Sequence, residues 1–245
     1  MSAIPISRVL QKLDEYLGRK DFDAAERHLR YWEEDARVSG DMRGLLTVTN
    51  EQIGFYRKIG REQDALTAAE TAIKLTEELN LSDSVSMGTT LVNAATAYKA
   101  FGHADRAIPL YEKAKCLYEA KLAPNDGRLG GLYNNMALTL LDLRKFAEAE
   151  ALFNKALSVM EHIPDGELEM AITWCNLADL YTATGEGNVQ ECLEKAFELL
   201  DKETLPRNGY YAFVCEKCAN TFAYYGYPYC ERELIKRART IYERA

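Results

Sequence analysis

The cysteine pair Cys215 and Cys218 has the spacing at which two thiolates can bind one zinc ion. Zinc needs four ligands, however, and the sequence near this pair supplies one further cysteine, Cys230, and no histidine. Residues three positions apart also share one face of a helix, where a free cysteine packs as a small hydrophobic side chain. We therefore expect Cys215 and Cys218 in a helical core, and we predict no metal and no cofactor.

The three histidines, His28, His103 and His162, lie far apart in the sequence. None has a carboxylate or a nucleophile at a spacing that suggests a catalytic triad. The sequence also contains no glycine-rich phosphate loop and no paired-carboxylate motif. It therefore predicts no enzymatic activity and no catalytic residue.

An asparagine recurs at one register position, because Asn93, Asn135 and Asn176 are separated by steps of 42 and 41 residues. Asparagine is a mediocre helix former, so its recurrence within helical segments needs a reason. A primary amide carries an acceptor and two donors, which can pair with the C=O and N–H groups of an extended peptide. It can equally bond a backbone group or a side chain on the adjoining segment. Both roles stay open.

These asparagines belong to an internal repeat that runs through the chain. One column is aromatic in five of its six members, which are Tyr16, Tyr56, Tyr98, Leu140, Tyr181 and Phe222, at steps of 40, 42, 42, 41 and 41 residues. A second column is almost entirely alanine and holds Trp32, Ala72, Ala114, Ala156, Ala196 and Ala238. The 245 residues are therefore predicted to form a single domain, residues 1–245, with six repeats at about 5–40, 41–81, 82–123, 124–164, 165–204 and 205–245.

Each repeat is predicted to contain two helices, because apolar residues recur at helical spacing in both of its halves. The turn between the halves is short and carries a glycine or a charged residue, which suits two antiparallel helices. Pro109 is expected in the first turn of its helix, where a missing N–H costs little. The sequence thus predicts an all-α fold of about twelve helices.

The composition excludes several classes of partner. The 38 acidic residues outnumber the 30 basic ones, which argues against nucleic-acid binding. The chain has no apolar run of the length that a membrane span needs, and no secretory signal is visible at its beginning. Six cysteines are too few for a disulfide scaffold, so reduced thiols in the cytoplasm are expected.

The repeat pattern resembles the tetratricopeptide repeat. The residues that carry the resemblance are Tyr133, Met136, Ala137 and Leu140 on a first helix, then Ala149, Phe153 and Ala156 on a second. The period exceeds the common 34 residues by about eight, or about one turn per helix. This long form is similar to the kinesin light chain type of repeat, as YNNMA at 133–137 and IPLYEKA at 108–114 indicate. The resemblance covers about residues 5–244 and implies a right-handed superhelix.

In such a superhelix the first helix of every repeat lines a concave groove. Peptide-binding members of the family use asparagine in the column described above to hold the peptide main chain. The peptide-binding residues that the resemblance implies are Asn93, Asn135, Asn176, Asn134, Lys99, Arg57, Lys58, Asp179 and Asn220. The same wall is expected to carry Asn50, Glu51, Thr96, Asp142, Glu216 and Lys217. Its charges could orient a peptide, or they could form an ordinary solvated face.

The predicted function is that of a non-enzymatic scaffold, monomeric or weakly dimeric, that holds an extended peptide or a partner segment in the groove. The alternative is a regulatory sensor of a short signalling peptide that modulates a partner protein. The aromatic segments 209–214 and 222–230 are a further feature. They can form a tyrosine-rich core of the last repeat, or a docking patch for a partner or a second copy of the chain.

Overall fold

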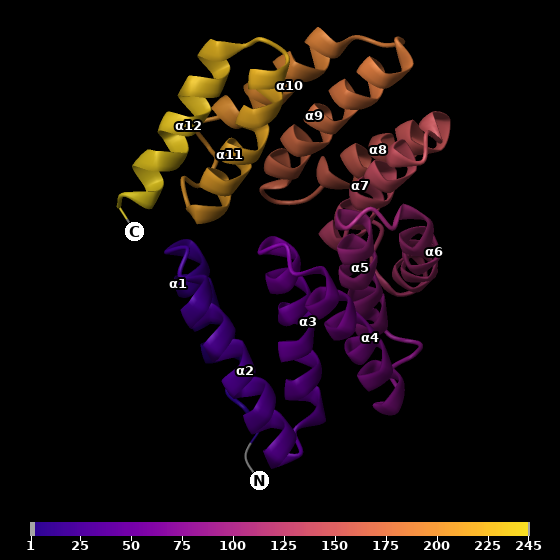
Figure 1. Cartoon of the computed structure of the whole chain (residues 1–245). Coiled ribbons are helices and arrows are strands. Elements are labelled where there is room, and N and C mark those ends of the chain that lie inside the picture. Colours follow the sequence, from indigo (N-terminus) through magenta and orange to yellow (C-terminus); the bar gives the residue numbers. More distant parts are fainter. Residues whose placement is uncertain (1–2, 245) are drawn as a thin grey trace. The chain divides into compact units, whose positions relative to one another are not determined.

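The structure of the protein is a computed structural model that describes residues 3–244 (Figure 1). These residues form twelve α-helices and no strand, which confirms the predicted all-α class. The helices are α1 (Ile6–Gly18), α2 (Phe22–Ser39), α3 (Met42–Lys58), α4 (Glu62–Glu78), α5 (Val85–Ala100), α6 (Ala104–Lys121), α7 (Gly127–Asp142), α8 (Phe146–Met160), α9 (Gly166–Thr184), α10 (Val189–Asp201), α11 (Gly209–Tyr224) and α12 (Pro228–Tyr242).

The helices belong to two compact units. Unit 1 ends at Leu122 and contains α1 to α6, and unit 2 begins at Ala123 and contains α7 to α12. Within each unit, consecutive helices pack as antiparallel pairs, and each pair lies inside one of the six predicted repeat ranges (Figure 1). That the six repeats act as a single domain stays a prediction.

The second repeating column brings the helices of each pair close together. Its alanines are buried with 0% exposure, among them Ala72 and Ala114 in unit 1 and Ala156 in unit 2. A methyl side chain keeps neighbouring helix backbones close, and larger side chains fill the adjacent space. Tyr111 and Phe153 do this in their repeats, and both are also 0% exposed.

In two repeats, the last turn of the second helix packs against a glycine of the first helix. Gly88 in α5 lies against the ring of Tyr118 in the last turn of α6, and an added Cβ would be 2.5 Å from its Cε1 atom. The Tyr118 hydroxyl is hydrogen-bonded to the hydroxyl of Thr89, at 2.8 Å. Gly130 in α7 meets Met160 at the end of α8 in the same way. In these two repeats the last turn of the second helix therefore reaches the first helix where that helix has no side chain.

The turn inside every repeat has a residue in the left-handed conformation four positions after the aromatic column, and the turn of the fifth repeat has a second one, Gly187. Glycine, which pays no steric penalty there, fills four of the six positions. The six residues are Lys20, Gly60, Gly102, Arg144, Gly185 and Gly226, with φ between 57° and 82°. The prediction of a glycine or a charged residue in this turn is confirmed.

The predicted position of Pro109 is wrong. Helix α6 begins at Ala104, so Pro109 lies in its second turn, where it deprives the carbonyl of Asp105 of a helical hydrogen bond. Both residues are exposed, so water can bind that carbonyl. Solvent access therefore makes the proline tolerable in this helix.

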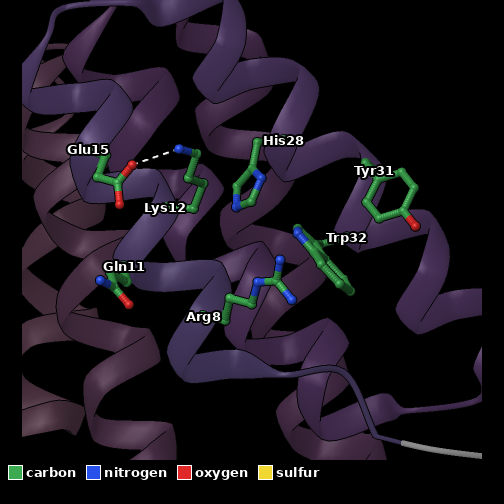
Figure 2. Close-up of a pocket in the computed structure, with 7 residues that line it drawn as sticks. All are labelled: Arg8, Gln11, Lys12, Glu15, His28, Tyr31 and Trp32. Carbon is green, nitrogen blue, oxygen red and sulfur yellow. Dashed lines mark hydrogen bonds and ion pairs between the residues drawn. The ribbon is translucent and has the colours of Figure 1, made fainter.

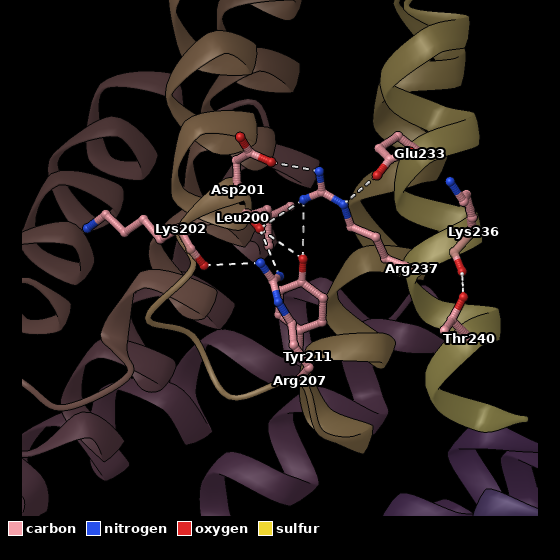
Figure 3. Close-up of polar contacts among 9 residues, drawn as sticks. All are labelled: Leu200, Asp201, Lys202, Arg207, Tyr211, Glu233, Lys236, Arg237 and Thr240. Atoms are coloured by element: carbon pink, nitrogen blue, oxygen red, sulfur yellow. Dashed lines mark hydrogen bonds and ion pairs between the residues drawn. The ribbon is translucent and has the colours of Figure 1, made fainter. Parts of the chain in front are cut away.

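Two arginines stabilise the end of α10 (Figure 3). The carbonyl oxygen of Leu200 accepts hydrogen bonds from the Tyr211 hydroxyl at 2.9 Å, from Arg237 Nη1 at 3.1 Å and from Arg207 Nη1 at 3.3 Å. Arg237 also pairs with Asp201 at 2.6 Å. Carbonyl groups in the last turn of a helix have no helical hydrogen-bond donor. A cation at this end also interacts favourably with the negative end of the helix dipole. These contacts fix α11 and α12 against the end of α10.

We predict that Gly88→Ala lowers the free energy of unfolding by about 1–3 kcal/mol, because the new methyl group displaces the buried ring of Tyr118. Gly54→Ala is the matched control in α3, since an added Cβ at Gly54 meets nothing within 4 Å. It should stabilise the protein by up to about 1 kcal/mol, because alanine is the better helix former. Urea titration of both variants measures the difference, and equal stabilities would contradict the packing described.

Candidate functional site

Two pairs of asparagines link the first helices of neighbouring repeats. In unit 1, Asn93 on α5 donates a hydrogen bond from Nδ2 to Oδ1 of Asn50 on α3, at 3.0 Å. In unit 2, Asn176 on α9 donates in the same way to Oδ1 of Asn134 on α7, at 2.8 Å. The structure therefore brings Asn134 and Asn176 together, and it pairs Asn93 with a residue of the same predicted wall.

A threonine three positions before the donor asparagine completes each link. Asn50 Nδ2 donates to Thr90 Oγ1 at 3.1 Å, and Thr173 Oγ1 donates to Asn134 Oδ1 at 3.2 Å. This is the structural pairing that the sequence left open for the asparagine column. Asn93 is half-buried and keeps one N–H and its amide oxygen for a further partner, whereas Asn134 and Asn176 are buried, at 6% and 9% exposure. The peptide-holding role of Asn93 and Asn176 stays a prediction.

Asn135 differs from the other two members of its column. Its side-chain amide is half-buried and forms no hydrogen bond with any residue between 3 and 244. In the sequence, Val92 holds the register position that Asn50 and Asn134 hold in their repeats. Because the Asn135 amide has no hydrogen-bonding partner in residues 3–244, its donors and its acceptor stay available to another molecule.

Unit 2 contains a hollow of about 580 Å³ between α9 and α11. Two predicted site residues line it, the exposed Asp179 on α9 and the exposed Asn220 on α11. Its remaining lining is Thr182, Ala183, Thr221, Tyr224 and Tyr225. The volume is within the range of ligand-binding clefts, and the lining mixes apolar surface with hydrogen-bonding groups. This arrangement can hold an extended segment by main-chain and side-chain contacts.

Tyr225 organises the polar side of this hollow. Its hydroxyl donates to Asp179 Oδ1 at 2.9 Å and is hydrogen-bonded to Thr182 Oγ1 at 2.8 Å. Although the Asp179 side chain is exposed, neighbouring protein atoms partly desolvate its carboxyl and raise its pKa, and the hydrogen bond from Tyr225 partly opposes this rise. Burial also raises the pKa of Tyr225 to about 12, so the phenol remains a donor at neutral pH. Sequence reasoning missed Thr182 and named Tyr225 only as part of the aromatic segment 222–230, because neither residue belongs to a repeating column.

The aromatic segments of the last repeat divide between core and surface. Tyr211 and Phe222 are buried in unit 2, as a tyrosine-rich core requires. Tyr210, Phe213 and Tyr224 are 45%, 47% and 75% exposed. The rings of Tyr210 and Phe213 stack with their centroids 6.2 Å apart. Some of these aromatic residues therefore form the core of the last repeat, and others are exposed where a docking patch would need them.

The predicted cations lie near the C-terminal ends of their helices. Arg57 and Lys58 are exposed in the last turn of α3, where no residue of the described chain forms an ion pair with them. Lys99 is half-buried in the last turn of α5. A cation in the last turn also interacts favourably with the helix dipole. Their role in binding acidic groups stays a prediction.

Unit 1 has a second hollow, of about 570 Å³, where Trp32 occupies the alanine column. The residues that line it are Arg8, Gln11, Lys12 and Glu15 on α1 and His28, Tyr31 and Trp32 on α2, and Figure 2 shows them around the space between the two helices. His28 Nε2 is hydrogen-bonded to the carbonyl of Val9 at 2.9 Å, and Lys12 pairs with Glu15 at 2.6 Å. At this position the bulky indole of Trp32 replaces the alanine that lets the two helices of the other repeats pack closely.

The candidate zinc ligands lie in the core, as predicted. Cys215 and Cys218 are 0% and 1% exposed, and burial raises the pKa of the Cys215 thiol. A buried thiol of raised pKa is a poor nucleophile and a poor metal ligand. In the part of the chain that the structure describes, no group of three or more His, Cys, Asp or Glu side chains is arranged to hold a metal ion. No helix in that part is long and apolar enough to cross a membrane.

We predict different effects on stability for alanine substitutions of Asn93 and Asn135, which belong to the same column. Asn93→Ala removes a hydrogen bond and leaves Oδ1 of Asn50 without that donor, so we expect a loss of about 1 kcal/mol in the free energy of unfolding. Asn135→Ala should change it by less than about 0.5 kcal/mol, because the Asn135 amide has no partner in residues 3–244. Chemical denaturation tests both variants, and equal losses would contradict the assignment.

The half-buried carboxylate of Glu51 on α3 leads to a pH-dependent prediction. Partial desolvation raises the pKa of Glu51, and the nearby Asp14 raises it further. The folded state then holds its proton to higher pH than the unfolded state, so stability falls as the pH rises through that interval. Glu51→Gln should therefore be more stable than the parent at pH 7, and the difference should shrink below pH of about 4.

Thermal unfolding at several pH values measures this effect. The exposed Glu203→Gln serves as the control and should show no such trend. A Glu51→Gln variant that is less stable than the parent at pH 7 would show that the Glu51 carboxylate is stabilised and not strained by burial.

Comparison with known proteins identifies the repeat. The family model described as "Tetratricopeptide repeat" matches residues 129–202, from the first turn of α7 to the residue after α10. No curated protein matches the sequence.

Several solved structures share the fold. A structure of the nearly identical TPR-like repeats of a putative kinesin light chain from Podosopora anserina has a TM-score of 0.54 at 19% identity, covering 80% of this chain and 94% of that one. BtubC (BKLC) from P. vanneervenii has a TM-score of 0.60 at 19% identity, covering 91% and 90%. NprR in complex with its cognate peptide NprX has a TM-score of 0.62 at 16% identity, covering 94% and 64%.

These likenesses concern the fold. Three findings indicate the same kind of repeat. They are the paired helices of both units, the similarity to the kinesin light chain repeat structure, and the family match over residues 129–202. Residues 129–202 therefore match the tetratricopeptide repeat, and the described chain shares the paired-helix fold of solved tetratricopeptide-like structures.

Proposed function

We propose that the protein is a non-enzymatic scaffold that holds an extended peptide, or an extended segment of a partner protein, on the face formed by its first helices. The tetratricopeptide fold is typical of protein–protein interaction. This coarse assignment follows from the repeat itself. The face, the residues and the form of the ligand are our proposal.

The hollow between α9 and α11 carries the proposal. It lies on two first helices, and its lining includes the predicted residues Asp179 and Asn220. The Asn220 amide is exposed, and the carboxylate of Asp179 is fixed by the Tyr225 hydroxyl. An extended peptide has unpaired N–H and C=O groups, so it needs acceptors and donors of this kind beside an apolar contact surface.

The asparagine column supports the same role in a modified form. Asn93 and Asn176 use one amide N–H to link neighbouring first helices, which fixes the orientation of their remaining polar atoms. Asn135 has its whole amide available. We propose that Asn135 holds a peptide main chain directly, that the half-buried Asn93 links two first helices and presents its amide oxygen to the ligand, and that the buried Asn176 supports the wall through its link to Asn134.

The alternative, a sensor of a short signalling peptide, is favoured by one comparison. NprR shares the fold and has been solved with its cognate peptide. A sensor needs two conformations with different affinities for the peptide. Small-angle scattering with and without a bound peptide separates the two roles, because a scaffold should keep its radius of gyration and a sensor should change it.

Further properties stay predictions. We propose that the protein has no catalytic activity, that it is cytoplasmic, and that it is a monomer or a weak dimer. The cysteines of the described chain are unpaired, which suits a reducing compartment.

A selection experiment tests the proposed function. The full chain is immobilised and used to select from a displayed library of random 12-residue peptides, and the selected peptides are measured by calorimetry against variants. We expect Asn135→Ala and Asn220→Ala each to weaken binding about fivefold or more, since each removes hydrogen bonds at the interface. Lys74→Ala, an exposed change on the second helix α4, is the control and should leave the affinity unchanged.

The proposal fails if no peptide is enriched above the background of the matrix. It also fails if the enriched peptides bind the two asparagine variants and the parent equally well. Circular dichroism of every variant shows whether the helices are intact.

A further inference from the structure

We infer that the face of unit 2 formed by α9 and α11 takes a basic, aromatic-rich peptide segment, with two cationic side chains four residues apart. This inference rests on the proposed function and adds the chemical class of the ligand. The inference is carried by an exposed aromatic stripe, by two carboxylates without an ion-pair partner in residues 3–244, and by the positions of those two residues along α9.

The aromatic stripe runs along the whole of α11. Its members are Tyr210, Phe213, Lys217, Asn220 and Tyr224, which are spaced by three or four residues and so share one face of the helix. All five are exposed, and the three rings keep between 45% and 75% of their surface in contact with solvent. Exposed aromatic residues gathered on one face mark interaction surfaces, because their burial contributes strongly to binding.

Two carboxylates on α9 border this stripe. Glu169 accepts a hydrogen bond from the Tyr210 hydroxyl, and Asp179 accepts one from the Tyr225 hydroxyl at 2.9 Å. Within residues 3–244 neither carboxylate forms an ion pair. Partial desolvation by neighbouring protein atoms raises the pKa of the half-buried Glu169 and of the more exposed Asp179, so the charged form of each is disfavoured.

Other acids of unit 2 are treated differently. Glu167, two residues from Glu169, pairs with Lys202 at 3.2 Å, and Asp201 pairs with Arg237 at 2.6 Å. Lys217 is the cation on the aromatic stripe, and it attracts Glu169 only at a distance. Glu216 lies on the same helix, and its carboxylate accepts a hydrogen bond from the Tyr242 hydroxyl. The three carboxylates of Glu169, Asp179 and Glu216 therefore outnumber the single cation, Lys217, around the stripe.

The spacing of the two carboxylates fits an extended chain. Glu169 and Asp179 are ten residues apart on one helix, which is about 15 Å along its axis. Four residues of an extended peptide span about 13 Å, and side chains at positions i and i+4 point to the same side. Two basic side chains at this spacing can therefore reach both carboxylates, with small adjustments of their long flexible stems.

Charge decides which peptide this face prefers. A neutral peptide would bury Glu169 and Asp179 further without compensation, and an acidic peptide would be repelled. A guanidinium group can pair with a carboxylate and stack on a tyrosine ring at the same time. Arginine beside aromatic residues therefore satisfies both the carboxylates and the stripe.

Three fluorescein-labelled peptides test the inference against the full chain by fluorescence anisotropy. They share the frame Ser-Phe-Xaa-Gly-Phe-Ser-Xaa-Phe-Ser, in which both Xaa positions carry arginine, glutamine or glutamate. We expect the arginine peptide to bind at least tenfold more tightly than the glutamine peptide, and the glutamate peptide to bind most weakly. The arginine preference should decline between 50 and 500 mM NaCl, because salt screens charge interactions.

Variants of the chain locate the effect. Asp179→Asn and Glu169→Gln keep the size and the acceptor of each side chain, and each should weaken the arginine peptide about three- to tenfold without affecting the glutamine peptide. Glu203→Gln, at an exposed glutamate outside the stripe, should change neither. Phe213→Ser should weaken all three peptides.

The outcomes separate the inference from the proposed function. Equal binding of the arginine and glutamine peptides, both sensitive to Phe213→Ser, would overturn the cationic preference and keep the peptide scaffold. If no peptide binds, and peptide selection on the parent chain also fails, both ideas are wrong. Self-association of the parent chain that Phe213→Ser abolishes would assign the stripe to a second copy and overturn the inference.

Discussion

The close approach of two helices within a repeat is the constraint on which this structure depends. It is possible because alanine and glycine stand where the backbones come nearest, as Ala114 with its 0% exposure and Gly88 under Tyr118 show. The second helix of each pair thereby supports the first and leaves one of its faces uncovered. The exposed site residues Asp179, Asn220 and Tyr224 lie on such uncovered faces, and Tyr225 follows at the end of α11.

The uncovered faces divide their polar groups between structure and ligand. Asn50 and Asn134 accept hydrogen bonds from the next repeat, which links first helices inside each unit. Asn135, in the same column as Asn93 and Asn176, has no side-chain hydrogen bond within residues 3–244. Members of one repeating column thus serve the structure in two repeats and stay available for a ligand in another. The carboxylates of unit 2 follow the same logic, because Asp179 is held by a phenol and lacks a cation.

The architecture could be predicted from the sequence because the residues that recur at each repeat are those that pack between the helices. The spacing of Tyr98, Leu140 and Tyr181 determines the register of the helices, and the helix pairs fall inside the predicted ranges. Site details escaped prediction where they depend on residues outside the columns. Tyr225 fixes Asp179 from a helix end, and the start of α6 at Ala104 moved Pro109 into the second turn. Neither the contact nor the boundary has a periodic signal.

The central claim is that the α9–α11 face of unit 2 is the surface that binds peptide. Hydroxyl-radical footprinting of the full chain, with and without a bound selected peptide, tests it most directly. Tyr224 on the stripe is 75% exposed and Tyr229 on α12 is 69% exposed, so both rings react readily in the unbound chain. The account predicts that peptide protects Tyr224 and Phe213 and leaves Tyr229 unchanged. Equal protection of Tyr224 and Tyr229, or protection of neither Tyr224 nor Phe213, would contradict it.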